Sequence, residues 1–318
     1  MIQVGWQGWV LFNAAVLFML LLDLGVFHRK SERVSIQAAL GWTAFWVALS
    51  LAFNGWIWQE YGQQKGLEFL AGYILEKSLS VDNLFVFLLI FSYFKVPPEL
   101  QHRVLFFGIM GALVLRGIFI YLGATLVHQF HWILYVFGVF LVFSGIKLLF
   151  IGDDDDQNPE NAVVRAVRAR LRLADGFRGE SFFVRENGVR YATPLFLVLI
   201  AVETSDVLFA VDSIPAIFGV TDDTFIVYTS NVMAILGLRA LYFALAGLLE
   251  YFHYLNYGLA IVLIFIGGKM LGEEYLEMSI STELAVIGGV LALAVIASLV
   301  FPKKLDEQIQ DMEEGDHE

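Results

Sequence analysis

The chain contains a succession of hydrophobic stretches, each about as long as a bilayer is thick, and this pattern constrains the fold more than any other feature. About 20 apolar residues cross a bilayer as a helix, which satisfies its own backbone hydrogen bonds in lipid. The stretches cover roughly residues 8–27, 36–58, 67–92, 103–127, 130–151, 193–219, 226–249, 255–272 and 283–301. Only 16 % of the residues are charged, against about 25 % in soluble domains. The sequence therefore predicts an all-α polytopic membrane protein with nine spans.

The distribution of lysine and arginine predicts the orientation, since cytoplasmic loops are rich in these residues. With the N-terminus outside, fourteen of the 20 basic residues lie in cytoplasmic segments, and the outer loops contain only Lys65. We therefore expect N-out and C-in. One transmembrane domain is expected over 1–301, interrupted by a cytoplasmic loop at 152–192 with a short basic helix and a hairpin. The acidic tail, 302–318, is expected to be disordered.

Spans three to five and spans six to eight repeat the same order of polar and small residues. The Leu115-Arg116-Gly117 segment matches Leu238-Arg239-Ala240, 123 residues further on. In the same way His131, Tyr135, Phe143, Gly145 and Lys147 match His253, Tyr257, Phe265, Gly267 and Lys269 at a spacing of 122. The copies are 62–151 and 193–272, and each contains three spans, so they cross the membrane in opposite senses. Inverted repeats of this kind are typical of secondary transporters, whose site lies near the midplane.

Five carboxylates fall inside two of the predicted spans. A charge at the bilayer centre costs roughly 2.5–3.5 kcal/mol on insertion scales, so such residues indicate function. The acids are Glu76, Asp82, Glu203, Asp206 and Asp212. Ion pairs with Lys77, Arg116 and Arg239 are the alternative interpretation, in which these charges merely hold helices together. Three cations leave about two of the five negative charges unbalanced, and a divalent cation or protons would balance them.

The predicted site offers only oxygen ligands, which suit Mg²⁺, Ca²⁺ and Mn²⁺. The chain has no cysteine, and no histidine lies in either acidic span. Pro215 lacks an N–H, so we expect span six to be broken beside Asp212 with the Val211 carbonyl freed. The predicted metal ligands are Asp82, Asn83, Asp206, Asp212 and the Val211 carbonyl. We expect Glu76, Glu203, Ser78, Ser205 and Ser213 to support these ligands or carry protons. We expect Lys77, Arg116 and Arg239 to balance charge.

Two segments resemble the TerC family, and within it the Alx-type branch of bacterial membrane proteins. They are Glu76-Lys-Ser-Leu-Ser-Val-Asp82-Asn83 and Glu203-Thr-Ser-Asp206-Val-Leu-Phe-Ala-Val-Asp212-Ser-Ile-Pro215-Ala. The resemblance runs over about residues 8–301. It implies export of Mn²⁺ from the cytoplasm across the bacterial inner membrane, with the metal as transported substrate. The residues by themselves indicate a hard divalent cation, and the preference for manganese comes from the family.

A second hypothesis is a metal-binding scaffold or chaperone that supplies metal to partner proteins without net transport. Its docking surface would be the cytoplasmic loop, 152–192. An enzyme is not expected, because the chain has neither cysteine nor a histidine motif of metalloprotease type. The expected partners are a divalent metal ion, the lipid bilayer, a membrane or cytoplasmic protein at this loop, and further copies of the chain. Nucleic acid is not an expected partner.

Overall fold

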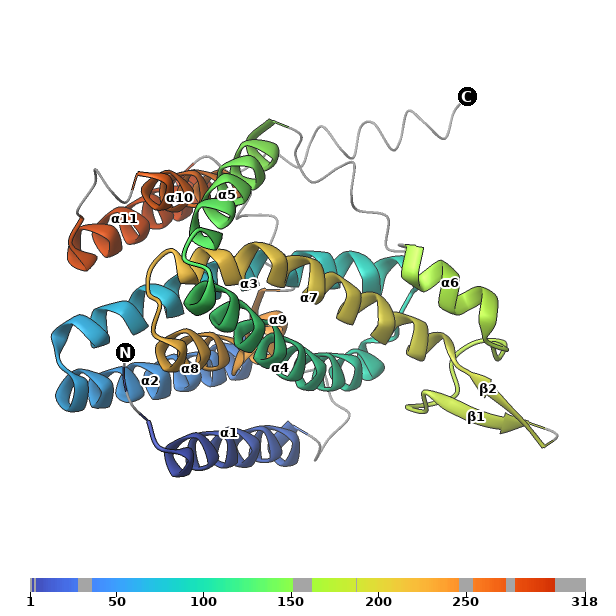
Figure 1. The fold of residues 1–318 in the computed structure, drawn as a ribbon. Helices are drawn as coiled ribbons and strands as arrows, with labels where there is room; N and C mark the ends of the chain where they lie inside the picture. The colour runs from blue at the N-terminus through green and yellow to red at the C-terminus, as the bar shows by residue number, and fades with distance from the viewer. Residues whose placement is uncertain are drawn as a thin grey trace.

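The protein is a bundle of helices with a small two-stranded sheet at one end (Figure 1). The computed structural model describes residues 2, 4–27, 36–150, 162–186, 188–245, 254–272 and 278–300, without the side chains of residues 23–27, 82 and 245. The helices are α1 (Trp6–Phe27), α2 (Ile36–Tyr61), α3 (Gln63–Tyr93), α4 (Pro98–Gln129), α5 (Ile133–Phe150), α6 (Ala162–Arg170), α7 (Pro194–Phe218), α8 (Thr224–Ile235), α9 (Leu238–Leu245), α10 (Leu255–Leu271) and α11 (Ile280–Val300). The strands are β1 (Phe183–Glu186) and β2 (Val189–Ala192). The predicted acidic tail, 302–318, lies outside the described residues.

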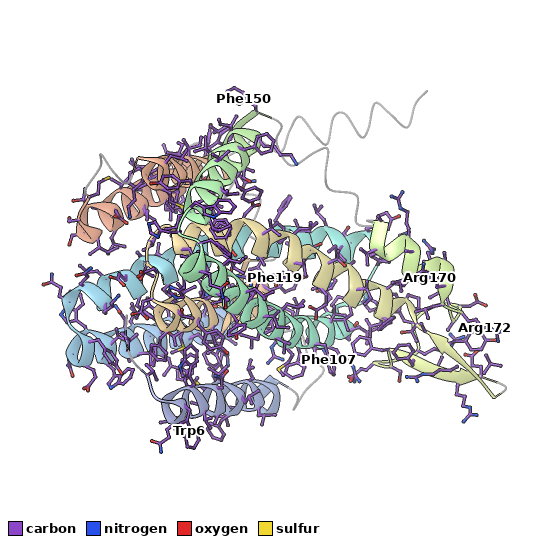
Figure 2. The ribbon with its side chains drawn as sticks, viewed as in Figure 1. Trp6, Phe107, Phe119, Phe150, Arg170 and Arg172 are labelled. Carbon is purple, nitrogen blue, oxygen red and sulfur yellow. The ribbon has the colours of Figure 1, made fainter. Side chains whose placement is uncertain are left out.

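Each hydrophobic stretch of the sequence coincides with helix in the structure. Six helical segments are both long and apolar enough to cross a membrane, counting α8 and α9 together. Bilayer-facing surface is also evident, since large apolar side chains are exposed at the periphery, among them Trp6 and Phe150 (Figure 2). The all-α polytopic membrane class is therefore confirmed. The number of nine spans and their orientation stay predictions.

The seventh predicted span, 226–249, is interrupted. Helix α8 ends at Ile235, α9 begins at Leu238, and Gly237 between them has a φ of 79°. Only glycine adopts this left-handed conformation without steric cost, so Gly237 permits the break. The ring of Trp46 covers it, because a Cβ at Gly237 would lie 2.6 Å from that ring.

The break expected at Pro215 in the sixth span is absent, and this prediction is wrong. Helix α7 runs from Pro194 to Phe218 with Pro215 inside it. A proline removes one backbone hydrogen bond, and at this position the loss falls near the end of α7, where the carbonyl of Pro215 still accepts from Gly219. The Val211 carbonyl lacks an amide donor at position 215, but its helix is not unwound.

Helices α5 and α10 pack closely through small residues. A Cβ added at Gly138 would lie 3.0 Å from the carbonyl oxygen of Gly267, and one at Gly145 would lie 2.7 Å from that of Ala260. Backbones approach this closely in membranes where glycine and alanine remove the intervening side chains. The order of these contacts makes the two helices antiparallel.

The same contacts are reciprocal. Gly145 and Gly267 are equivalent positions 122 residues apart, and so are Gly138 and Ala260. Gly138 lies against Gly267 and Gly145 lies against Ala260, so each residue of one equivalent pair contacts a residue of the other pair. In addition, α3 packs on α8 and α4 packs on α7. A two-fold axis in the membrane plane would produce this pattern, which the predicted inverted repeat requires.

The segment between the two copies forms a compact unit at one end of the bundle (Figure 1). Helix α6 packs on α7 and its Val164 is buried. Strand β1 pairs with β2 in antiparallel register. Arg103 of α4 ties this unit to the bundle through an ion pair of 2.7 Å with Glu180. The basic helix and the hairpin predicted for the loop are both present, and Arg170 and Arg172 lie at this end (Figure 2).

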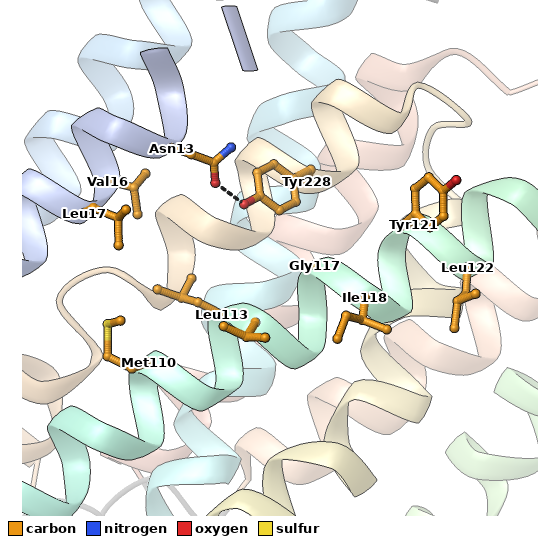
Figure 3. Close-up of a pocket in the computed structure, with 11 residues that line it drawn as sticks. Asn13, Val16, Leu17, Met110, Leu113, Gly117, Ile118, Tyr121, Leu122 and Tyr228 are labelled. Atoms are coloured by element: carbon orange, nitrogen blue, oxygen red, sulfur yellow. Dashed lines mark hydrogen bonds between the residues drawn. The ribbon is translucent and has the colours of Figure 1, made fainter. Parts of the chain in front are cut away.

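A groove of about 420 Å³ separates α1 from α4 (Figure 3). Its lining is apolar apart from a few residues such as Asn13 and Tyr228, which form a hydrogen bond of 2.5 Å. None of the predicted metal ligands whose side chains the structure describes lines it. Glu76, Glu203, Asp206 and Asp212 therefore lie outside this groove.

Candidate functional site: carboxylates around a buried arginine

Arg116 of α4 joins acids from both predicted copies. Its side chain is 1 % exposed and forms ion pairs with Glu76 of α3 and with Asp206 of α7, the second at 3.1 Å. Glu76 is 1 % and Asp206 3 % exposed. A guanidinium with its fixed fork of donors is well suited to hold two carboxylates in this way. The predicted charge-balancing role of Arg116 is consistent with this geometry.

Asn231 of α8 completes this cluster and was not anticipated from the sequence. Its amide nitrogen donates to Glu76 at 2.9 Å, and its amide oxygen accepts from Arg116 at 3.3 Å. The Ser80 hydroxyl also donates to Glu76, and Arg116 donates to Ser213, both at 3.4 Å. Four helices (α3, α4, α7 and α8) thus meet at one polar centre.

Glu203 lies one helical turn before Asp206 and packs against α4. Gly111 leaves the space that the carboxylate occupies, because a Cβ at that glycine would overlap it. The Oε2 atom of Glu203 is buried and has no hydrogen-bond partner among the described residues. An unsatisfied buried carboxylate oxygen is costly, and a bound cation or a proton would satisfy it.

The charges of this centre do not balance. Glu76, Asp206 and Glu203 carry three negative charges when ionised. Arg116 supplies one positive charge, and Lys77, whose charge acts on Glu76, supplies a second. One negative charge remains, which a bound cation or a proton would offset. This imbalance distinguishes the centre from an ordinary buried ion pair, which would be neutral.

Asp212 belongs to a separate part of α7. Its Oδ1 accepts a hydrogen bond of 2.8 Å from Ser144 of α5, and Lys147 lies close enough for its charge to act on the carboxylate. Since Asp206 and Asp212 are six residues apart on a continuous helix, they project from different faces. The structure therefore does not bring these two predicted ligands together.

The remaining predicted site residues are placed as follows. Asn83 is 1 % exposed, and both polar atoms of its amide lack partners among the described residues. Lys77 donates to the carbonyl oxygen of Ala234 at 3.1 Å. Arg239 is buried in α9. The Val211 side chain is 47 % exposed, Ser78 is half-buried, and the Ser205 hydroxyl donates to the Ala201 carbonyl of its own helix at 2.9 Å.

Within the described residues, no group of three or more acidic or histidine side chains is close enough together to hold a metal ion. The Asp82 carboxylate, one of the predicted ligands, lies outside that description. The proposed ligand set therefore stays a prediction. Beside Glu76 and Asp206 the structure places the guanidinium of Arg116.

Other buried acids form direct ion pairs with lysines. Glu68 and Asp223 share Lys65, at 2.7 Å and 3.3 Å. Glu283 pairs with Lys269 at 2.6 Å. These pairs lie near the ends of α3, α8, α10 and α11, whereas the central acids Glu76 and Asp206 pair with an arginine.

Comparison with known proteins places the chain among bacterial membrane proteins. The family described as "Integral membrane protein TerC family" matches residues 61–306. An "Uncharacterized membrane protein STKORF319" of Myxococcus xanthus is 50 % identical over 92 % of both chains. A "Putative membrane-bound redox modulator Alx" of Salmonella typhi is 48 % identical over 95 % of this chain and 97 % of its own. Its counterpart of the same name in Escherichia coli K12 is also 48 % identical, over 94 % and 96 %. No solved structure matches the chain.

Proposed function

The chain belongs to the TerC family of integral membrane proteins, and from that premise we propose that it exports Mn²⁺ from the cytoplasm through the carboxylates around Arg116. The observation that supports transport is the excess of negative charge at a centre buried between helices of both copies. Such intramembrane acids are expensive and mark ion pathways. The choice of manganese rests on the family resemblance, together with a ligand set of oxygen atoms.

In the proposed mechanism the structure corresponds to the cation-free state. Arg116 then neutralises Glu76 and Asp206, and an arriving cation displaces the guanidinium from Asp206. Glu203, one turn away, contributes the carboxylate oxygen that lacks a partner. Asn83 and Asp82 would complete the ligand set when the helices move, with Ser213 beside them. Asp212 and the Val211 carbonyl would join it only if α7 unwound between positions 206 and 212.

Exchange with protons follows from the same chemistry. A carboxylate that loses its metal in a site with little water tends to take up a proton, because burial disfavours the charged form. Outward movement of metal would then be coupled to inward movement of protons. The protein is proposed to work in the cytoplasmic membrane of a bacterium.

The experiment compares manganese content, by elemental analysis, in manganese-loaded bacteria that express wild type, Asp206→Asn or Asp222→Asn at equal membrane levels. Asp222 is an exposed residue of the loop before α8 and serves as the matched control. Wild type and Asp222→Asn should lower cellular manganese, with magnesium and calcium unchanged, and Asp206→Asn should not. Equal manganese in all strains, including cells without the protein, would refute export.

A scaffold that docks partners is the second candidate, supported by the unit formed by α6 and the hairpin. Seven of its arginines are exposed, namely Arg165, Arg168, Arg170, Arg172, Arg178, Arg185 and Arg190. It predicts metal binding without flux and loss of function when this unit is deleted. The name of the Alx relatives suggests redox modulation. Since this chain has no cysteine, any such role here would not use thiols.

A further inference from the structure

The break between α8 and α9 presents backbone carbonyl groups to a lysine. The ammonium of Lys77 donates to the carbonyl oxygen of Ala234 at 3.1 Å, across 157 residues of sequence. Ala234 is fully buried in the last turn of α8. Arg239 follows the same break in the sequence, so the break has a basic residue after it in α9 and the ammonium of Lys77 at the end of α8.

The C-terminus of α8 has the properties of a site that binds a cation. The last helical hydrogen bond there runs from the Leu236 N–H to the Val232 carbonyl at 3.1 Å, and the chain then turns at Gly237. Carbonyls at a helix C-terminus carry the negative end of the helix dipole. Discontinuous helices use such ends to coordinate cations in several transporters.

Helix α2 closes this end from the side. Trp46 covers Gly237, and the hydroxyl of Ser50 donates to the Met233 carbonyl at 3.4 Å. Both α2 side chains are buried, at 3 % and 2 % exposed. Without the ammonium, the Ala234 carbonyl would be left in a place closed to water, at a free-energy cost.

The other copy of the repeat contains neither the lysine nor the break. The residue that aligns with Lys77 is Thr204, whose hydroxyl donates to the Ile200 carbonyl of its own helix at 2.6 Å. The residue that aligns with Gly237 is Val114, and α4 is continuous there. Lys77 and the break at Gly237 therefore occur together, and their equivalents, Thr204 and a continuous α4, also occur together. This is expected if the ammonium satisfies a carbonyl that the break exposes.

We propose that the carbonyl end of α8 is a binding site for a small monovalent cation, which the ammonium of Lys77 fills. The class of ligand follows from the group that it would replace. The ammonium carries a single charge beside Glu76 and binds a carbonyl oxygen, so an ion of single charge, such as Na⁺, K⁺ or NH₄⁺, would replace it without changing the local charge. The proposal does not depend on manganese export. Removing the ammonium opens the site, and the free ion then stabilises the fold.

The test measures thermal unfolding of purified protein in detergent, in choline chloride and in equal concentrations of NaCl, KCl or NH₄Cl. Lys77→Ala is compared with wild type and with Lys95→Ala. Lys95 is the exposed lysine just after the same helix, α3. In choline, Lys77→Ala should unfold at a lower temperature than the other two proteins. One of the three cations should then raise its Tm by about 3 °C, in a saturable manner. Wild type and Lys95→Ala should shift by less than about 1 °C, since their site is filled or unchanged.

Lys77→Gln is measured in parallel, because its amide keeps an N–H donor for the Ala234 carbonyl, so its Tm in choline should lie between those of Lys77→Ala and wild type, with a smaller response to salt. If Lys77→Ala does not purify in choline, a yield that depends on one of the three cations during extraction supports the proposal, and an equally low yield in all four salts overturns it. Equal Tm values in choline and in all three salts, or an equal salt response in wild type, overturn it. Neither outcome bears on manganese flux, so the two proposals fail separately.

Discussion

The two three-helix copies share a pattern of polar residues but differ at their middle helices. In the first copy α4 is continuous over 32 residues and holds Arg116 among carboxylates. In the second copy the equivalent helix is divided into α8 and α9 at Gly237. One copy therefore holds its buried arginine on an unbroken helix, whereas the other has a helix break at the equivalent place.

The residue at one equivalent position explains the difference. Val114 of α4 corresponds to Gly237, and a β-branched residue cannot readily adopt the positive φ that the break requires. Val114 is 60 % exposed and lines the groove between α1 and α4, whereas Gly237 lies under Trp46. The predictions below test this comparison, from the largest expected effect to the smallest.

Replacing the buried arginine should have the largest effect. Arg116→Met leaves Glu76 and Asp206 buried without a cation, which should destabilise the protein by about 3–5 kcal/mol. Unfolding titrations in SDS would measure this. Arg178→Ala is the control, since its pair with Glu186 is exposed and worth at most about 1 kcal/mol. A similar loss in both variants would contradict a special role for Arg116.

Closing the break should have the next largest effect. Gly237→Ala requires a left-handed alanine and a Cβ against the Trp46 ring, so we expect a loss of about 3 kcal/mol. At the equivalent position, Val114→Ala should cost less than about 1 kcal/mol because Val114 is mostly exposed at the groove. The same unfolding measurement applies. If both variants were equally tolerated, the two middle helices would not differ in the way described.

Removing the amide that bridges Glu76 and Arg116 should have an intermediate effect. Asn231→Leu loses a hydrogen bond to a charged group and should cost about 2 kcal/mol. Asn54→Leu is the matched control, because Asn54 is buried on α2 and its amide oxygen has no partner among the described residues. A near-neutral control and a destabilised Asn231 variant are expected from thermal unfolding. The reverse order would remove Asn231 from the centre.

The smallest effect is expected at the second part of α7. Ser144→Ala removes the hydroxyl that donates to Asp212 and should cost about 1 kcal/mol. Ser92→Ala, at an exposed hydroxyl near the end of α3, should change stability by less than about 0.5 kcal/mol. Calorimetry can resolve the difference. A neutral Ser144→Ala would show that Asp212 does not depend on α5 for its position.

The sequence predicted the membrane class, the helical segments and the burial of Glu76, Asp206 and Arg116. These follow from apolar length and from the cost of charge in lipid, which are properties of the chain itself. The helix break was expected at Pro215 because proline lacks an N–H, but one lost bond near a helix end is tolerated. Gly237 was overlooked, since a single glycine in an apolar stretch rarely interrupts a helix.

The partners of the acids could not be predicted in the same way. Asn231 and Ser144 are uncharged residues within apolar stretches, and their significance appears only when helices distant in sequence pack together. Lys77 was expected to balance an acid, and it donates to a carbonyl that exists as a free acceptor because the helix is divided. Tertiary contacts decide which polar groups meet, and local sequence does not specify them.

The central claim is that metal crosses the membrane through the carboxylates around Arg116. The most direct measurement is release of Mn²⁺ from proteoliposomes that contain purified protein and are loaded with the metal, with and without a proton gradient. Wild type should release Mn²⁺, faster when protons can enter in exchange, and Asp206→Asn should release none while remaining folded. Binding of Mn²⁺ by wild type without any release, at either pH setting, would contradict transport and favour the scaffold.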